Sequence, residues 1–279
     1  MSTYAYYNGN FDTRENIKLP LSDRAVFFGD GIYDASIGRN ENIFLESEHI
    51  DRFLCNAKAL NISHKYTEKS LSNVLHEVIK KSGINSFFLY FQLTRNSNIR
   101  VHSPKLCTNA NLLITIEPHT LPDENKKMRL ITYEDKRYGY CNLKTLNLLP
   151  SVMASEKADD AGCEEAVFIR NGIVTECAHS NISILKSGRL KTHPLNEHIL
   201  PGITRRHLIF ACNALGIECR ECTFGIDELY SADEILITST TKLCLPASHI
   251  DGVKVGGGDR ILLNEICHFL RDEYNNFTR

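Results

Sequence analysis

The chain has 279 residues and a formal net charge of −2, with 42% apolar and 24% charged residues. This length can bury a substantial core as one large domain or two smaller ones, and the composition excludes a disordered or collagen-like protein. The small net charge provides no basic field for nucleic acid or an anionic membrane, so we expect neither partner.

The N-terminal sequence "MSTYAYYNGNF" lacks the basic start and apolar run of a signal peptide. No apolar stretch is long enough to span a bilayer. Ten cysteines are scattered along the chain. Their one close pair is Cys219 and Cys222. No second close pair exists to complete a zinc site, so the two residues are either two free thiols or a redox dithiol. We expect no metal and a cytoplasmic location, where thiols stay reduced.

Strands and helices alternate in the first half of the sequence. The Asn8-Gly9 pair predicts a tight hairpin after a strand at Tyr4–Tyr7. Apolar spacing predicts one helix from about Ser47, as N-cap, to Leu60, and a second from about Glu68 to Ser82 that ends at Gly83. The expected strands are 31–37 paired with 43–45, then "SFFLYFQLT" and "NLLITIEP".

Prolines and charges in "PHTLPDENKKM" interrupt this pattern and predict a linker. We therefore expect an N-terminal α/β domain over 1–118, a linker over 119–128 and a C-terminal domain over 129–279. The second domain should be rich in antiparallel strands, with hairpins at Asn171-Gly172 and Ser187-Gly188, which makes the fold class α+β. Its expected helices begin near Pro150, near Gly202 and near Asp259.

Lys144 lies in the mostly apolar segment "CNLKTLNLLP". Its ammonium group is costly to bury unless it is paired or neutralised. The lysine could extend its tip to water, or its amine could be a nucleophile for a carbonyl, with the neighbouring leucines shielding it from solvent. The segment alone leaves both interpretations open.

Two turns in the second half suit a phosphate group. "LPGITRRHL" places Gly202, Ile203 and Thr204 at a helix start, where free N–H groups and the helix dipole favour an anion. "TSTTK" supplies further hydroxyl groups directly after a predicted strand. Each turn is also compatible with ordinary helix capping or turn chemistry.

Two further segments carry candidate charged groups. Glu176 ends the predicted strand "GIVTE" and could hold a protonated ring nitrogen, a pairing that tunes a pyridine cofactor. Arg100 and His102 are two residues apart in "NIRVHSP", so both can face one anion. Solvated surface positions are the alternative for all three residues.

The order of these signals resembles the fold type IV family of pyridoxal-phosphate enzymes, the class IV aminotransferases. "PLSDRAVFFGDGIYDASI" and "EHIDRFLCNAKALNI" are similar to the family's N-terminal domain. "LKTLNLLPSVMASEKADDAGCEEAVFIRNGIVTE" and "LITSTTKLCLP" are similar to its C-terminal domain. The resemblance covers nearly the whole chain and implies the cofactor pyridoxal 5'-phosphate, amino acid and 2-oxo acid substrates, and a homodimer.

The resemblance also implies a role for each candidate residue. Lys144 would form the internal aldimine and move the proton, Glu176 would pair with the pyridine nitrogen, and Leu200 would pack on the ring. The phosphate would be held by Arg52, Ile203, Thr204, Ser239 and Thr240. Arg52 lies off the apolar stripe of its predicted helix, so we expect it to be free for this role.

The segment "RNSNIRVHSP" resembles the Arg-x-His loop of D-amino-acid aminotransferases, in which arginine and histidine from the partner subunit bind the substrate carboxylate together with a tyrosine. Here these residues would be Arg100, His102 and Tyr33, which implies D-alanine and 2-oxoglutarate as substrates. Aminodeoxychorismate lyase and branched-chain aminotransferase are the alternatives on the same fold. The segments "YGYCNLK" and "ECAHS" depart from the D-specific pattern, which affects substrate preference more than cofactor use.

Overall fold

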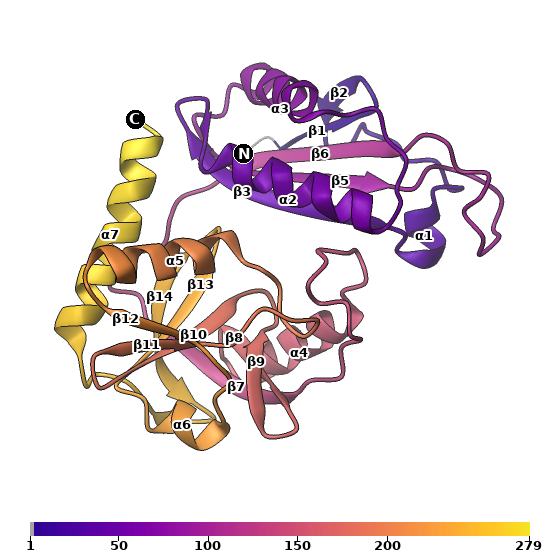
Figure 1. Cartoon of the computed structure of the whole chain (residues 1–279). Coiled ribbons are helices and arrows are strands. Elements are labelled where there is room, and N and C mark those ends of the chain that lie inside the picture. Colours follow the sequence, from indigo (N-terminus) through magenta and orange to yellow (C-terminus); the bar gives the residue numbers. More distant parts are fainter. Residues whose placement is uncertain (1–2) are drawn as a thin grey trace. The chain divides into compact units, whose positions relative to one another are not determined.

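The computed structural model describes residues 3–279, which form two compact units (Figure 1). Unit 1 contains the described residues up to Thr120, together with Leu143–Asn147 and Asn275–Arg279. Unit 2 contains Leu121–Asn142 and Leu148–Tyr274. The segment around Lys144 therefore belongs to unit 1, although it follows the predicted linker by more than a dozen residues.

Unit 1 is built on a six-stranded antiparallel sheet in the order β2-β1-β6-β5-β3-β4. Its strands are β1 (Tyr4–Tyr7), β2 (Asn10–Thr13), β3 (Gly31–Arg39), β4 (Asn42–Ile43), β5 (Ser86–Thr94) and β6 (Asn111–Pro118). Asn8 and Gly9 have φ of 48° and 101°, as the predicted two-residue hairpin requires. The predicted hairpin and the predicted pairing of β3 with the next strand are confirmed, but β4 is Asn42–Ile43 and does not extend to Leu45.

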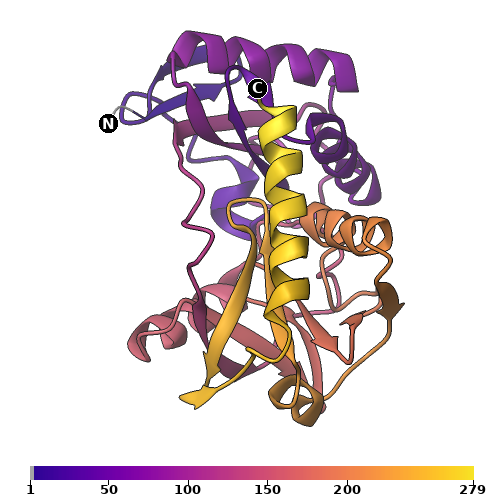
Figure 2. The same ribbon diagram turned by 90° about the vertical axis from the view of Figure 1, so that its left-hand side faces the viewer.

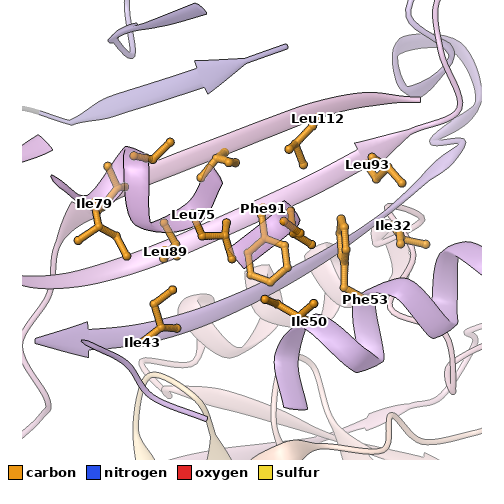
Figure 3. Packing of buried hydrophobic residues seen from close by; sticks show 14 of the residues in the cluster. Ile32, Ile43, Ile50, Phe53, Leu75, Ile79, Leu89, Phe91, Leu93 and Leu112 are labelled. Atoms are coloured by element: carbon orange, nitrogen blue, oxygen red, sulfur yellow. The ribbon is translucent and has the colours of Figure 1, made fainter. Parts of the chain in front are cut away.

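Two helices, α2 (Glu46–Ala59) and α3 (Glu68–Ser82), cover one face of this sheet, while the short α1 (Arg24–Phe28) precedes β3. Figure 3 shows the core between α2, α3 and the sheet, where Phe53 of α2 meets Phe91 of β5 with ring centroids 4.8 Å apart. The predicted cap of α2 is wrong. Its N-cap is Leu45, with φ of 53° and a buried side chain, and Ser47 lies inside the first turn.

Unit 2 contains a nine-stranded sheet in the order β12-β11-β10-β13-β14-β7-β8-β9, with β15 added at β14. Its strands are β7 (Met128–Glu134), β8 (Glu165–Arg170), β9 (Ile173–Cys177), β10 (Asn181–Lys186), β11 (Arg189–Thr192), β12 (Glu218–Glu221), β13 (Glu234–Ser239), β14 (Leu243–Ile250) and β15 (Val253–Lys254). The pairs β11–β12, β14–β7 and β7–β8 are parallel and the rest are antiparallel. Both predicted hairpins are confirmed.

The helices with residues in unit 2 are α4 (Leu149–Asp160), α5 (Ile203–Ala214), α6 (Ile226–Tyr230) and α7 (Arg260–Phe277). Figure 2 shows α7 in profile next to α5, and Phe210 and Phe269 join these two helices with ring centroids 6.0 Å apart. Pro150 lies in the first turn of α4, as predicted.

Residues 3–279, which the structure describes, contain neither a membrane-spanning helix nor a group of metal-binding side chains. No helix there is long and apolar enough to cross a membrane. All ten cysteines are free, including Cys219 and Cys222 on either side of the end of β12, and no group of histidine, cysteine or acidic side chains in this range could hold a metal ion.

Candidate active site

The backbone around Lys144 is fixed to β3. Tyr33 N donates to Lys144 O at 3.0 Å, and Leu146 N donates to Gly31 O at 3.1 Å. Glycine fits position 31, between this segment and β5, because a Cβ there would lie 2.8 Å from Leu146 Cδ1 and 2.7 Å from Leu93 O. The Lys144 segment is therefore held along β3 by main-chain bonds.

The amine of Lys144 lies against an aromatic ring. Its Nζ is 4.3 Å from the centroid of Tyr33, and the Tyr33 ring stacks on Tyr90 at 5.4 Å. A cation is attracted to such a ring face, and the tyrosine pair orients the amine. The predicted shielding by leucines is wrong for Leu148 and Leu149, which are 40% and 68% exposed because they lie at the start of α4.

Arg52 is fixed by a buried carboxylate. Its Nε donates to Asp34 Oδ2 at 2.8 Å and its Nη2 to Asp34 Oδ1 at 2.8 Å. The expected phosphate role of Arg52 therefore remains a prediction, for a guanidinium that already has one carboxylate partner. His49 Nδ1 lies 2.7 Å from Asp34 Oδ1. Burial opposes ionisation of Asp34, but Arg52 and His49 outweigh it and hold the pKa of that carboxyl well below its usual range. Burial is the main cause of the lowered pKa of His49.

Arg100 and His102 lie on an exposed loop of unit 1 that Arg24 holds in place. Arg24 Nη2 donates to His102 O at 3.0 Å, Nη1 donates to the preceding carbonyl at 2.6 Å, and Nε pairs with Asp30 at 2.7 Å. The guanidinium of Arg100 lies 5.4 Å from the ring centroid of Phe28, and the ring of His102 lies 5.2 Å from it. The two predicted carboxylate-binding residues therefore meet on one aromatic ring.

Glu176, at the end of β9, is buried and accepts hydrogen bonds with both carboxylate oxygens. Its Oε2 accepts from Leu200 N at 3.0 Å and from Asn181 Nδ2 at 2.9 Å, and its Oε1 accepts from Arg137 Nη1. Donors on both oxygens favour the ionised carboxylate. A charged carboxylate is what a protonated ring nitrogen needs as a partner.

Arg137 extends this cluster. It pairs with Asp135 at 3.0 Å and lies 4.3 Å over the ring of Phe168. Burial opposes ionisation of Asp135, but Arg137 and Arg170 lower the pKa of this carboxyl to about 2. The same carboxyl and Glu176 raise the pKa of Arg137, although burial works against its charge. The guanidinium is thus fixed as a cation between two carboxylates.

The start of α5 has the properties of an anion site. The N–H groups of its first turn, at Ile203 and Thr204, have no acceptor within the helix. The N-cap, Gly202, has no side chain that could accept from them, so they can bind an anion. A Cβ on Gly202 would lie 1.9 Å from Asn181 Oδ1, so only glycine fits beside the side chain that supports Glu176. This contact couples the predicted phosphate turn to the predicted partner of the ring nitrogen.

The turn after β13 provides hydroxyl groups. Ser239 and Thr240 are half-buried, and Ser239 Oγ lies 3.5 Å from Thr241 Oγ1. Nearby in sequence, the buried Thr238 Oγ1 has no hydrogen-bond partner within the described chain, and Thr238 is the register partner of Asn181. These donors and the free N–H groups of α5 fit a phosphate ester.

Each unit contributes part of the predicted set. Unit 1 holds Tyr33, Arg52, Arg100, His102 and Lys144, and unit 2 holds Glu176, Leu200, Ile203, Thr204, Ser239 and Thr240.

The sequence reasoning missed the residues that hold these groups in place, namely Asp34, His49, Arg24 and Arg137. A charged residue within an apolar strand, as in "GIYDASI", is the signal that could have found Asp34.

Comparison with known proteins identifies the family. Residues 31–250 match amino-transferase class IV. The chain is 36% identical over 258 residues to the D-alanine aminotransferase of Listeria monocytogenes serotype 4b (strain F2365), covering 91% of this chain and 89% of the relative. It is 34% identical over 258 residues to the D-alanine aminotransferase of Bacillus licheniformis, covering 90% of each.

Solved structures share the fold. The branched-chain aminotransferase of Thermoproteus uzoniensis with norvaline superposes with a TM-score of 0.89 at 24% identity, covering 99% of this chain and 96% of that one. The branched-chain amino acid aminotransferase of Escherichia coli gives a TM-score of 0.87 at 23% identity, covering 95% of this chain and 92% of that one.

Proposed function

Because this chain belongs to the class IV aminotransferase family, we propose that it transaminates D-amino acids, with D-alanine and 2-oxoglutarate giving pyruvate and D-glutamate. It is a pyridoxal-phosphate-dependent aminotransferase with the fold type IV architecture, as the sequence resemblance implied. The D-alanine aminotransferases, at 32–36% identity over most of the chain, favour D-alanine over a branched-chain substrate.

The residues present fit the cofactor. When bound, pyridoxal phosphate supplies an aldehyde carbon that takes up the amino group and a ring that accepts electrons. We assign its phosphate to one binding set, which consists of Arg52, Ile203, Thr204, Ser239 and Thr240. Glu176 would hold the ring nitrogen, and Leu200 would pack on the ring.

Lys144 carries the proton transfer. Its Nζ would take the proton from the substrate α-carbon as general base and deliver it to the other carbon bonded to the transferred nitrogen. The Tyr33 ring, 4.3 Å away, keeps the amine directed to one place.

The Arg100/His102 loop carries the substrate assignment. A guanidinium binds a carboxylate through two parallel hydrogen bonds, and an adjacent imidazole adds a donor. This assignment is supported by the position of both side chains against the Phe28 ring, on a loop whose backbone carbonyls Arg24 binds. Tyr33 completes the substrate site in this proposal.

We further propose a cytoplasmic homodimer in which the Arg100/His102 loop of one subunit serves the site of its partner. We also propose an N-terminal domain over 1–118, a linker over 119–128 and a C-terminal domain over 129–279. The Lys144 segment is the exception, because it pairs with β3 of the N-terminal domain.

A substrate panel tests the activity. The purified protein, saturated with pyridoxal phosphate, is incubated separately with D-alanine, L-leucine and aminodeoxychorismate, with 2-oxoglutarate as acceptor for the two amino acids. We expect pyruvate from D-alanine and no ketoleucine or aminobenzoate. Product from L-leucine alone would assign branched-chain transamination instead, and aminobenzoate would assign the lyase reaction.

A further inference from the structure

In unit 2, a serine, a histidine and a carboxylate contact one another in a row, with the histidine in the middle. Ser155 Oγ, on α4, lies 3.0 Å from His179 Nε2. His179 Nδ1 lies 2.7 Å from Glu165 Oε1, at the start of β8. None of the three has a role in the proposed transamination. This is the connectivity of a nucleophile, a base and a residue that orients the base.

Glu165 is built to orient the histidine. Its side chain is fully buried and accepts from His179 N at 3.0 Å, from Ser180 Oγ at 2.9 Å and from Lys242 Nζ at 3.3 Å. Burial opposes its ionisation, but His179 and then Lys242 outweigh burial and lower the pKa of the carboxyl. Because the carboxylate faces Nδ1, it selects the tautomer with hydrogen on Nδ1, which leaves the lone pair of Nε2 toward Ser155.

The packing of the cluster keeps this geometry. Ala154 and Ala178, each adjacent to a member of the cluster, belong to one buried apolar group with Ala166 and Phe168. His179 is 57% exposed and Ser155 is half-buried, so a small molecule can reach the hydroxyl. Ser151 O, 2.9 Å from Ser155 Oγ, is a second acceptor for the hydroxyl hydrogen.

We propose that Ser155 is a second nucleophilic centre of this enzyme and is acylated by small activated esters, with His179 as its general base and Glu165 as the positioning residue. The Oγ–C bond to the acyl carbon forms as the C–O bond to the leaving group breaks. His179 Nε2 takes the Oγ proton and gives it to the departing oxygen. A water molecule then adds to the acyl carbon, releases the carboxylic acid and restores the serine.

The position of Ser155 sets the class of substrate. It lies inside α4, where backbone N–H groups bond within the helix and do not stabilise an oxyanion. The loss of one oxyanion donor costs about 10²–10³ in rate in hydrolases that have one. The centre therefore acts on activated aryl esters or acyl phosphates, whose leaving groups need little help, and not on peptides.

Acylation of the holoenzyme by p-nitrophenyl acetate tests this proposal. Saturation with pyridoxal phosphate keeps the Lys144 amine from competing for the reagent. After acid quenching, we expect peptide mapping of the wild-type protein to place the acetyl group on Ser155. Release of p-nitrophenol should fall about 100-fold in His179→Gln, because a general base contributes roughly 10²–10⁴ in rate. It should fall as much in Ser155→Ala.

The matched control is Ser151→Ala, one turn earlier on the same helix, which should react like the wild-type protein. Absence of the acetyl group from Ser155, or an unchanged rate in Ser155→Ala, would overturn the proposal. The mapping uses the wild-type chain, so the result stands even if a variant fails to fold. Transamination does not enter either measurement, and its failure in the substrate panel would leave this test intact.

Discussion

Asp34 and Arg52 form a two-bond ion pair in which both oxygens of a fully buried carboxylate accept from one guanidinium, each at 2.8 Å. Asp34 comes from β3 and Arg52 from α2, so the pair ties the sheet to the helix that covers it. It also fixes the direction of the guanidinium that we assign to the cofactor phosphate. The same carboxylate holds His49.

Asp34→Asn should destabilise the protein by about 3–5 kcal/mol, because it leaves a half-buried guanidinium without its anion. Urea unfolding followed by circular dichroism measures this loss. The matched control is Asp12→Asn, an exposed carboxylate on β2 of the same sheet, which should change stability by less than about 0.5 kcal/mol. Equal losses in the two variants would show that the Asp34–Arg52 pair contributes no more to the free energy of unfolding than an exposed carboxylate does.

The histidine beside Asp34 predicts a pH dependence of stability. Burial lowers the pKa of His49 from its ordinary value of 6.5, so the unfolded chain binds a proton at a pH where the native chain does not. The contribution of His49 to the free energy of unfolding is complete above about pH 6.5 and is lost as the pH falls below this value.

We therefore expect the free energy of unfolding to fall between about pH 7.5 and pH 5. The fall should be smaller in His49→Asn, which keeps a donor for Asp34 but does not titrate. His64 and His193 also have pKa values lowered by burial and account for the remaining slope. An identical slope in the variant would contradict the assignment to His49.

Gly202→Ala tests the coupling between the start of α5 and Glu176. The added Cβ would lie 1.9 Å from Asn181 Oδ1 and would push this side chain from its bonds to Glu176 and Leu200. We expect a loss of about 1–3 kcal/mol in stability, typical of overpacking, and weaker binding of pyridoxal phosphate in a fluorescence titration.

Gly225→Ala is the control for that substitution. Gly225 is likewise the N-cap of a helix, α6, but a Cβ there would meet its nearest atom at an ordinary 3.5 Å. Cofactor affinity should be unchanged in this variant. If both alanine variants bind the cofactor as the wild-type protein does, the contact with Asn181 does not support the site.

Arg100→Ala should raise the KM for D-alanine roughly ten- to hundred-fold, since a hydrogen-bonded charge pair contributes about 1.5–3 kcal/mol. The cofactor titration should not change, because Arg100 lies outside the proposed phosphate set. Lys105→Ala removes an exposed charge from the same loop and should leave the KM unaltered. A wild-type KM in Arg100→Ala would remove the main structural reason for a D-amino acid substrate.

Much of the fold could be predicted from local sequence. The periodicity of α3 and the hairpin residues Asn8-Gly9 and Asn171-Gly172 each carry their own structural signal, and the structure confirms all three. The start of α2 could not be predicted, because a buried leucine in a left-handed conformation replaces the expected serine cap. Tertiary packing outweighs capping propensity there.

The candidate site could be predicted only in part. Lys144, Glu176 and the turn at Gly202 draw attention in the sequence, but each pattern alone also fits an ordinary structural role, and only the family resemblance implies a function for them. Arg137 contacts Asp135 and Glu176, residues that lie 2 and 39 positions away, and the longer contact depends on the pairing of strands. Such contacts leave no local pattern, which is why the supporting residues appear only in the structure.

A single turnover without a keto acid acceptor tests whether the enzyme acts on D-alanine. The holoenzyme is mixed with D-alanine, L-alanine or L-leucine in separate reactions, and the keto acid product and the aminated cofactor are quantified after acid quenching. We predict pyruvate equimolar with the bound cofactor from D-alanine and no keto acid from either L-amino acid. The Lys144→Ala variant should form pyruvate far more slowly than the wild-type protein. Keto acid formed from L-leucine, with none from D-alanine, would contradict the proposed D-amino acid specificity.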